Sequence, residues 1–391
     1  MTRWRTAAQN LGLVVASLVV SLYLGEAALR LLNPCTVATL ARPFGAMDPR
    51  PKAQVVADFR AGGTDAYPHH PAVTDPAATE VVFSGVAHVW TVGCAENGYW
   101  TGFTSDRYGF NNPDEVWDRS ALDVVVAGDS FTAGYCVFNR DHYLTTLRRG
   151  RNVLNLGQAS ANPLTELAAV REYADGRRTS VLLVQYFDND LLEASRSAAN
   201  PILRRYLDDP GYIQGLAAQR DAVDRRLKDR LDRLLARELA ALDRTGRPSP
   251  TDILLLRKFR HTLGLVRTER RFADPCQDVR KTPVDAALRR FGVQLIDGWQ
   301  ALAARLHARL AVAYFPTWHE LACPAYPADF PTFKSLLDAR GVPLIDTRAA
   351  FAGAPLDRVF PYRGFAHYTP AGNRLIGEHL ASRLDALSAP R

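Results

Sequence analysis

The chain lacks the cysteine spacing of a metal site. Its five cysteines include no CxxC pair, the spacing that many structural zinc sites use. The two adjacent histidines, His69 and His70, form an isolated pair in a proline-rich stretch. We therefore expect no bound metal, and we expect no other cofactor.

The sequence also lacks the features of a nucleic-acid-binding protein. Its 48 basic and 41 acidic residues give a net charge of +7, but the arginines are scattered or gathered in one helical segment, without interleaved aromatic residues. This distribution favours a solvated surface, so we expect no nucleic-acid partner. A content of 47% hydrophobic and 23% charged residues argues against disorder and allows one large core or two smaller ones.

Charged residues are missing from Thr6 to Gly25, and Arg3 and Arg5 precede this segment. Continued through Leu32, it is long enough for a helix that crosses a bilayer. Because positive residues stay on the cytoplasmic side, we expect residues 1–32 to be a cytoplasmic stub and transmembrane anchor, with the remaining chain outside the cytoplasm. A cleaved signal peptide and a buried core helix are the alternatives.

Four cysteines lie in the part of the chain expected outside the cytoplasm, where disulfides persist. Up to two disulfides can form, with three possible pairings, and Cys35 lies just after the expected anchor. The four residues are Cys94, Cys136, Cys276 and Cys323.

The rest of the chain divides by composition and periodicity. Residues 33–78 are rich in proline, alanine and glycine, which predicts a linker with loops. Residues 79–120 contain alternating segments that predict a small β-rich element. Residues 121–390 alternate apolar strands with helical segments, which predicts a parallel α/β sheet of about five strands. The expected strands cover about 122–127, 152–156, 180–187, 309–315 and 342–346.

A helical insertion is expected from about residue 194 to 281, between the third and fourth strands. Leucines recur at helical spacing from Gln219 to Arg244, so one apolar face should pack on a neighbour. A second helix near Ile253 to Val266 is a candidate for that neighbour.

The segment VVVAGDSFTAG, from Val124 to Gly134, carries an apolar strand directly into a turn of small residues. Open α/β sheets bind ligands at the carboxyl ends of their strands. Ser130 is therefore the candidate nucleophile.

Three later segments supply the groups that a serine nucleophile needs. Gly157 and Asn189 each follow an apolar run, and His367 precedes a helical C-terminal segment. A serine hydroxyl needs an imidazole about 3 Å away to take its proton, and His367 is the best-placed histidine.

In this order, the motifs resemble those of the SGNH (GDSL) hydrolase family. They are Gly128-Asp129-Ser130, Asn155-Leu156-Gly157, Asn189-Asp190, and His367 with Ala371-Gly372-Asn373. The resemblance implies a flavodoxin-like, three-layer α/β/α fold with Ser130 and His367 as catalytic residues. It also implies an oxyanion hole formed by Ser130, Gly157 and Asn189.

One position departs from the family pattern. The usual aspartate three residues before the histidine is replaced by Gly364. In a serine triad this carboxylate fixes the histidine tautomer. Asp357, Asp346 or Glu320 are candidates to replace it from another loop; a backbone carbonyl would instead give a Ser-His dyad.

We expect an extracytoplasmic serine esterase that removes acyl groups, most simply acetyl, from a cell-envelope carbohydrate ester. A sugar hydroxyl in place of water would make the same site an O-acyltransferase. A non-catalytic glycan-binding or assembly module of the same fold is the third interpretation, which Gly364 favours. The expected partners are the glycan ester and, through the N-terminal helix, the membrane; the sequence indicates no protein partner.

Overall fold

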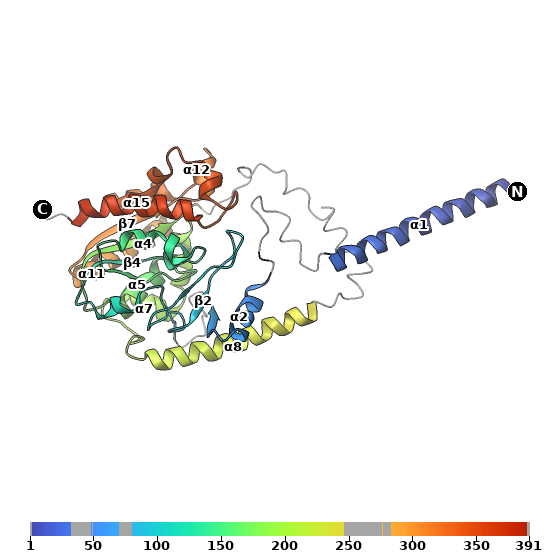
Figure 1. The fold of residues 1–391 in the computed structure, drawn as a ribbon. Helices are drawn as coiled ribbons and strands as arrows, with labels where there is room; N and C mark the ends of the chain where they lie inside the picture. The colour runs from blue at the N-terminus through green and yellow to red at the C-terminus, as the bar shows by residue number, and fades with distance from the viewer. Residues whose placement is uncertain are drawn as a thin grey trace.

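Figure 1 shows a computed structural model, which describes residues 2–32, 48, 50–69, 80–245, 276 and 283–388. Its centre is a five-stranded parallel sheet with the strand order β5-β4-β6-β7-β8. This is the flavodoxin-like order 2-1-3-4-5, so the predicted parallel α/β fold is confirmed. The strands are β4 (Ala121–Ala127), β5 (Val153–Asn155), β6 (Arg178–Phe187), β7 (Arg309–Phe315) and β8 (Leu344–Asp346).

Helices cover both faces of this sheet, because its strands alternate apolar side chains toward the two sides. Val125 of β4 belongs to a buried cluster that includes residues of α5 and α11. Val124 and Val126 belong to a second cluster, with residues of α4 and α15. Figure 1 shows α4 and α15 on one side and α5 and α7 on the other. The helices around the sheet are α3 (Ser130–Ala133), α4 (Tyr143–Leu147), α5 (Pro163–Tyr173), α6 (Asp190–Ser197), α7 (Pro201–Asp208), α11 (Ala286–Arg305), α12 (Trp318–Ala322), α13 (Phe330–Asp338), α14 (Leu356–Val359) and α15 (Pro370–Ser388), with 3-10 turns η2 (Asp114–Asp118), η3 (Asn139–Asp141) and η5 (Thr347–Phe351).

A second, three-stranded sheet confirms the predicted β-rich element. Its strands are β1 (Ala66–Pro68), β2 (Trp90–Val92) and β3 (Gly102–Thr104), in that order, with β2 and β3 antiparallel. The strand β1 and the helix α2 (Lys52–Ala61) both lie within residues 33–78, the range expected to be a linker with loops. The apolar residues Val55, Val56 and Ala66 are buried together, which explains why part of this range is folded.

A buried polar network ties the segment after β3 to the parallel sheet. The Asp106 carboxylate accepts hydrogen bonds from Asn112 Nδ2 and Trp117 Nε1, each at 2.8 Å. Asn112 in turn donates to the backbone oxygen of Asn155 at 2.9 Å and accepts from its backbone N–H at 2.8 Å. Buried polar groups that satisfy one another in this way fix one docking position, here at the carboxyl end of β5.

The helix predicted from the spacing of the leucines is present as α8 (Arg220–Thr245). Leu227, Leu231 and Leu235 are buried, and α8 contacts α2 and β1 of the small element. The other candidate neighbour, Ile253 to Val266, lies outside the described residues.

The N-terminal segment forms one helix, α1 (Thr2–Leu32). Among the residues that the structure describes, no helix combines the length and the apolar character needed to cross a membrane. The prediction of a transmembrane anchor at residues 1–32 is therefore not supported.

Candidate active site

The turn after β4 presents Ser130 at the carboxyl edge of the parallel sheet. Asp129 caps the short helix α3, because its carboxylate accepts a hydrogen bond from Phe131 N at 2.8 Å. The N–H of Asp129 donates to Gln185 Oε1 at 3.0 Å. These bonds leave the Ser130 N–H without an acceptor among the described residues, and the Ser130 side chain is half-buried.

His367 reaches Ser130 from the loop that precedes α15. Its Nε2 lies 2.7 Å from Ser130 Oγ. The rings of Phe131 and Tyr135 hold the imidazole, with centroid distances of 4.7 Å and 5.6 Å. The structure thus places the two residues in the relation that proton transfer from hydroxyl to imidazole requires.

The carboxylate that contacts His367 comes from Glu96, a residue that sequence reasoning missed. Glu96 Oε2 lies 3.1 Å from His367 Nδ1 and accepts the backbone N–H of His367 at 2.8 Å. The residue belongs to the loop that joins β2 to β3. With Nδ1–H donated to Glu96, Nε2 is left as the acceptor for the Ser130 proton.

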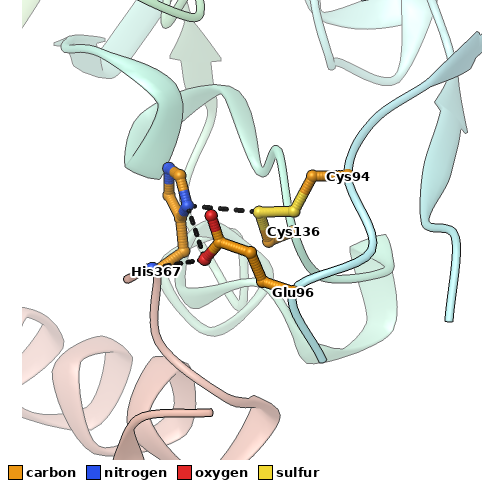
Figure 2. A group of neighbouring side chains, drawn as sticks. All are labelled: Cys94, Glu96, Cys136 and His367. Atoms are coloured by element: carbon orange, nitrogen blue, oxygen red, sulfur yellow. Dashed lines mark hydrogen bonds and ion pairs between the residues drawn. A yellow bond between two sulfur atoms is a disulfide. The ribbon is translucent and has the colours of Figure 1, made fainter. Parts of the chain in front are cut away.

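A disulfide ties the β2–β3 loop to the segment after the nucleophile. Cys94, two residues before Glu96, is bonded to Cys136, whose Sγ also lies 3.2 Å from His367 Nδ1. Figure 2 shows this bond beside the Glu96 and His367 side chains. Asn97 Nδ2 donates to the Cys136 oxygen at 3.0 Å, and Cys94 N donates to the Tyr135 oxygen at 3.0 Å. Of the three possible pairings, the structure contains Cys94–Cys136 together with Cys276–Cys323.

The three carboxylates expected near His367 have other positions. Asp346 accepts hydrogen bonds from the Arg348 guanidinium, and Glu320 accepts from the Tyr314 hydroxyl at 2.5 Å. Asp357 is exposed on α14. All three predictions are therefore wrong, because β8, α12 and α14 direct these groups to other partners or to solvent.

The backbone at Gly364 explains why the aspartate that is usual at this position in SGNH hydrolases does not fit here. Its φ of +146° is a conformation that residues with a side chain rarely adopt. A Cβ would meet only the Tyr362 ring, at 3.8 Å, so the obstacle is the backbone rather than lack of space. The loop path at this point therefore requires glycine.

Gly157 does not lie at the cavity, contrary to its expected role in the oxyanion hole. Its N–H donates to Asn155 Oδ1 at 2.8 Å. A Cβ on Gly157 would come within 2.5 Å of Ala133 N and of Thr132 C. This glycine lets the end of β5 approach the nucleophile helix, not the substrate.

Ala161 of this loop lines the cavity, and so does Ser160. Ser160 is exposed and holds a φ of +58°, a conformation uncommon outside glycine, asparagine and aspartate. Its N–H has no acceptor among the described residues. Together with the N–H of Ser130, it is a candidate donor to an oxyanion.

Asn189 also lines the cavity, as its expected role requires. Its Nδ2 donates to Glu193 Oε1 at 2.5 Å, so the amide must turn from Glu193 to serve a ligand. The cavity has a volume of about 210 Å³. Its lining consists of Asp129, Ser130, Phe131, Ser160, Ala161, Phe187, Asn189, Glu193, Phe365, Ala366 and His367.

The charges around His367 favour its protonated form. Burial alone lowers the pKa of His367, but the charge and hydrogen bond of Glu96, with a further contribution from Asp129, raise it above the ordinary value of 6.5. Burial also raises the pKa of Asp129, to about 6. The imidazole is thus a stronger base than a free histidine, as a group that accepts a hydroxyl proton should be.

The same corner of the site contains four groups of the types that bind metals. One atom from each of Cys94, Glu96, Cys136 and His367 lies within 4.8 Å of the others. The two sulfur atoms are joined in the disulfide (Figure 2), so neither is a thiolate ligand. In this state the arrangement is a histidine oriented by a carboxylate, and it can activate a hydroxyl nucleophile.

Comparisons with known proteins found structural matches only. No family model matches the chain, and no curated protein matches it. A protein assigned to the G-D-S-L lipolytic family from Desulfitobacterium hafniense DCB-2 matches 67% of this chain and 99% of its own, at 11% identity and a TM-score of 0.35. A member of the lipolytic protein G-D-S-L family from Veillonella parvula DSM 2008 matches 67% and 97%, at 11% identity and a TM-score of 0.34. A protein assigned to the SGNH hydrolases from Slackia heliotrinireducens matches 67% and 98%, at 13% identity and a TM-score of 0.33.

We predict that Glu96→Gln slows the reaction of Ser130 with a fluorophosphonate by about ten-thousandfold at neutral pH, because the amide stabilises the wrong histidine tautomer. The acid limb of the pH–rate profile should also move to lower pH, since the carboxylate that raises the pKa of His367 is gone. Mass spectrometry of labelled Ser130 over time measures both effects. The exposed Asp357→Asn serves as the control and should leave rate and profile unchanged; an unshifted profile in Glu96→Gln would contradict the assignment.

We also predict that adding Gly364→Asp to Glu96→Gln restores no labelling, because the new side chain imposes strain at a φ of +146°. The single variant Gly364→Asp should lose about 1–3 kcal/mol of unfolding free energy, and Gly364→Ala should lose a similar amount without a new charge. Urea unfolding and the labelling rate measure the two effects. Recovery of fast labelling in the double variant would show that the loop accepts the usual carboxylate.

Proposed function

We propose that this protein is a serine esterase of the SGNH type, with Ser130, His367 and Glu96 as its catalytic triad. The observation that carries the proposal is the pair of contacts on one imidazole: Ser130 Oγ at 2.7 Å from Nε2 and Glu96 Oε2 at 3.1 Å from Nδ1. Both contacts lie beside a cavity that Ser130 and His367 line. A nucleophile, a base and an orienting acid in this relation are the groups that acyl transfer requires.

In the proposed mechanism, Ser130 Oγ attacks the ester carbonyl carbon while His367 Nε2 accepts the hydroxyl proton. Glu96 stabilises the imidazolium that results. The N–H groups of Ser130 and Ser160, and the Asn189 amide once turned from Glu193, hold the oxyanion. His367 then gives its proton to the leaving alcohol, and water attacks the acyl-enzyme by the same steps in reverse.

The proposed substrate is an acetyl ester of a carbohydrate, located in the cell envelope. A cavity of about 210 Å³ is smaller than the roughly 300–1,000 Å³ of pockets for larger ligands, which favours a short acyl group. Two residues of the cavity lining suit this substrate. The ring of Phe365 is 56% exposed, and Glu193 contributes a carboxylate. An exposed aromatic ring and a hydrogen-bonding group together suit a sugar ring and its hydroxyls.

Glu96 weakens the case for a non-catalytic module of the same fold. The absence of an aspartate at Gly364 was the feature in its favour, and Glu96 supplies a carboxylate at His367 from another loop. Transfer of the acyl group to a sugar hydroxyl uses the same three residues and differs only in the acceptor.

We expect the wild-type chain to label with a fluorophosphonate and to hydrolyse a chromogenic acetyl ester. Both reactions should fall at least a thousandfold in Ser130→Ala and in His367→Ala, because each removes a member of one catalytic unit. Gel fluorescence and absorbance measure the two reactions. A folded wild-type protein that neither labels nor cleaves any acyl ester would leave the binding module as the better explanation.

For the substrate, we expect acetylated oligosaccharides to be cleaved with higher kcat/KM than octanoyl esters. The reverse order would contradict the assignment of a short acyl group.

We propose further that the domain works outside the cytoplasm, because two disulfides, Cys94–Cys136 and Cys276–Cys323, support an oxidising compartment. Alkaline phosphatase fused after Arg391 and expressed in a bacterial host should then be active, since that enzyme needs its own disulfides. A green fluorescent protein fusion at the same position is the matched control and should stay dark when exported by the general secretory route. Bright fluorescence with an inactive phosphatase would place the domain in the cytoplasm.

A further inference from the structure

The Cys94–Cys136 disulfide lies directly against the acid–base pair of the site. Cys136 Sγ is 3.2 Å from His367 Nδ1, the nitrogen that also faces Glu96 at 3.1 Å. Cys94 and Cys136 are both buried, and Glu96 and His367 are about four-fifths buried. A change in the oxidation state of this disulfide therefore changes the immediate surroundings of His367 (Figure 2).

We propose that reduction of Cys94–Cys136 creates a zinc site that inhibits the protein, with Cys94, Cys136, Glu96 and His367 as its ligands. The four donor atoms already lie within 4.8 Å of one another. Tetrahedral zinc, with bonds of about 2.0–2.3 Å, separates neighbouring donors by roughly 3.3–3.8 Å. His367 Nδ1 already lies 3.2 Å from Cys136 Sγ and 3.1 Å from Glu96 Oε2, whereas the two sulfur atoms must move apart to that separation once their bond is reduced. Two thiolates, one imidazole and one carboxylate form a donor set typical of zinc.

The zinc site forms in two steps, reduction of the disulfide and then binding of the metal. A phosphine reductant and one water convert the disulfide into two thiols and a phosphine oxide. One Zn²⁺ then replaces the two thiol protons, which are released to solvent. The zinc takes the lone pair of His367 Nδ1, and the proton of that nitrogen moves to Nε2.

This proton shift is the reason for inhibition. Nε2 now carries a hydrogen, so it no longer accepts the proton of Ser130 Oγ. Glu96 is held by the metal and no longer orients the free imidazole. The backbone N–H of His367, which donates to Glu96 Oε2 at 2.8 Å, remains as a second contact that orients this ligand.

The test uses the full chain carrying Cys35→Ser, Cys276→Ser and Cys323→Ser, in which Cys94 and Cys136 are the only cysteines. Tris(2-carboxyethyl)phosphine reduces it without air, and Co²⁺ serves as the spectroscopic probe. We expect one Co²⁺ per reduced chain, with the strong visible bands of tetrahedral coordination and a thiolate charge-transfer band. The oxidised chain, and a reduced chain with Cys94→Ser and Cys136→Ser added, should show neither. Should the background variant fail to fold, the same titration on the reduced wild-type chain is compared with and without Cys94→Ser and Cys136→Ser.

Variants of the two other ligands distinguish a four-ligand site from Co²⁺ binding by the two thiols alone. His367→Ala and Glu96→Ala should each weaken Co²⁺ binding at least tenfold, whereas the exposed Asp357→Asn should leave it unchanged. A reduced chain without tetrahedral Co²⁺ bands, or an affinity that His367→Ala does not alter, overturns the proposal.

The activity measurement rests on the proposed function, but the Co²⁺ titration does not. If the chain is an esterase, one equivalent of Zn²⁺ should abolish at least nine-tenths of the residual activity of the reduced protein, and a chelator should restore it. The oxidised protein should keep its activity under the same zinc concentration. A chain that cleaves no ester but shows the expected Co²⁺ spectrum would contradict the proposed function and leave the metal site standing; full activity with zinc bound would contradict the inhibition.

Discussion

The contact between Glu96 and His367 is the interaction on which the candidate site depends. It joins residues 271 positions apart, one on the hairpin loop of the small sheet and one before the last helix. Without Glu96, the other group described at His367 Nδ1 is the disulfide sulfur of Cys136, a weak acceptor that does little to fix the tautomer in which Nε2 accepts. The hydrogen bonds of Asn97 and Cys94 to the segment after α3, together with the disulfide, hold this contact in place.

The fold and three members of the site, Ser130, Asn189 and His367, could be predicted from the sequence because their signals are local. Each parallel strand is a run of apolar residues bounded by turn residues, so the run from Val124 to Ala127 is enough to predict a buried strand. The carboxyl ends of parallel strands meet at one edge of the sheet, which is why Ser130 and Asn189 line one cavity. His367 followed from the resemblance of the residues around it to a known pattern.

The orienting acid could not be predicted, because nothing local marks a carboxylate that docks from a second sheet. Glu96 lies in a hairpin loop where an acidic residue is ordinary. The only sequence signal was a pair of cysteines, Cys94 near this loop and Cys136 near the nucleophile, and sequence left their pairing open. The oxyanion-hole role expected for Gly157 differs from its position in the structure for a related reason. The motif indicates that this position has no room for a Cβ, but only the packed structure shows that Thr132 and Ala133, and not a substrate, occupy that space.

The position of Glu96 on the hairpin divides the candidate site between the two sheets. Ser130 follows a strand of the parallel sheet and His367 precedes the last helix, whereas Glu96 lies on the hairpin of the small sheet, so the three groups meet only where the two sheets are docked. Closure of the Cys94–Cys136 bond is the covalent event that secures the third group. The small sheet is thus a working part of the candidate site, because the acid is carried by a different sheet from the one that presents the nucleophile.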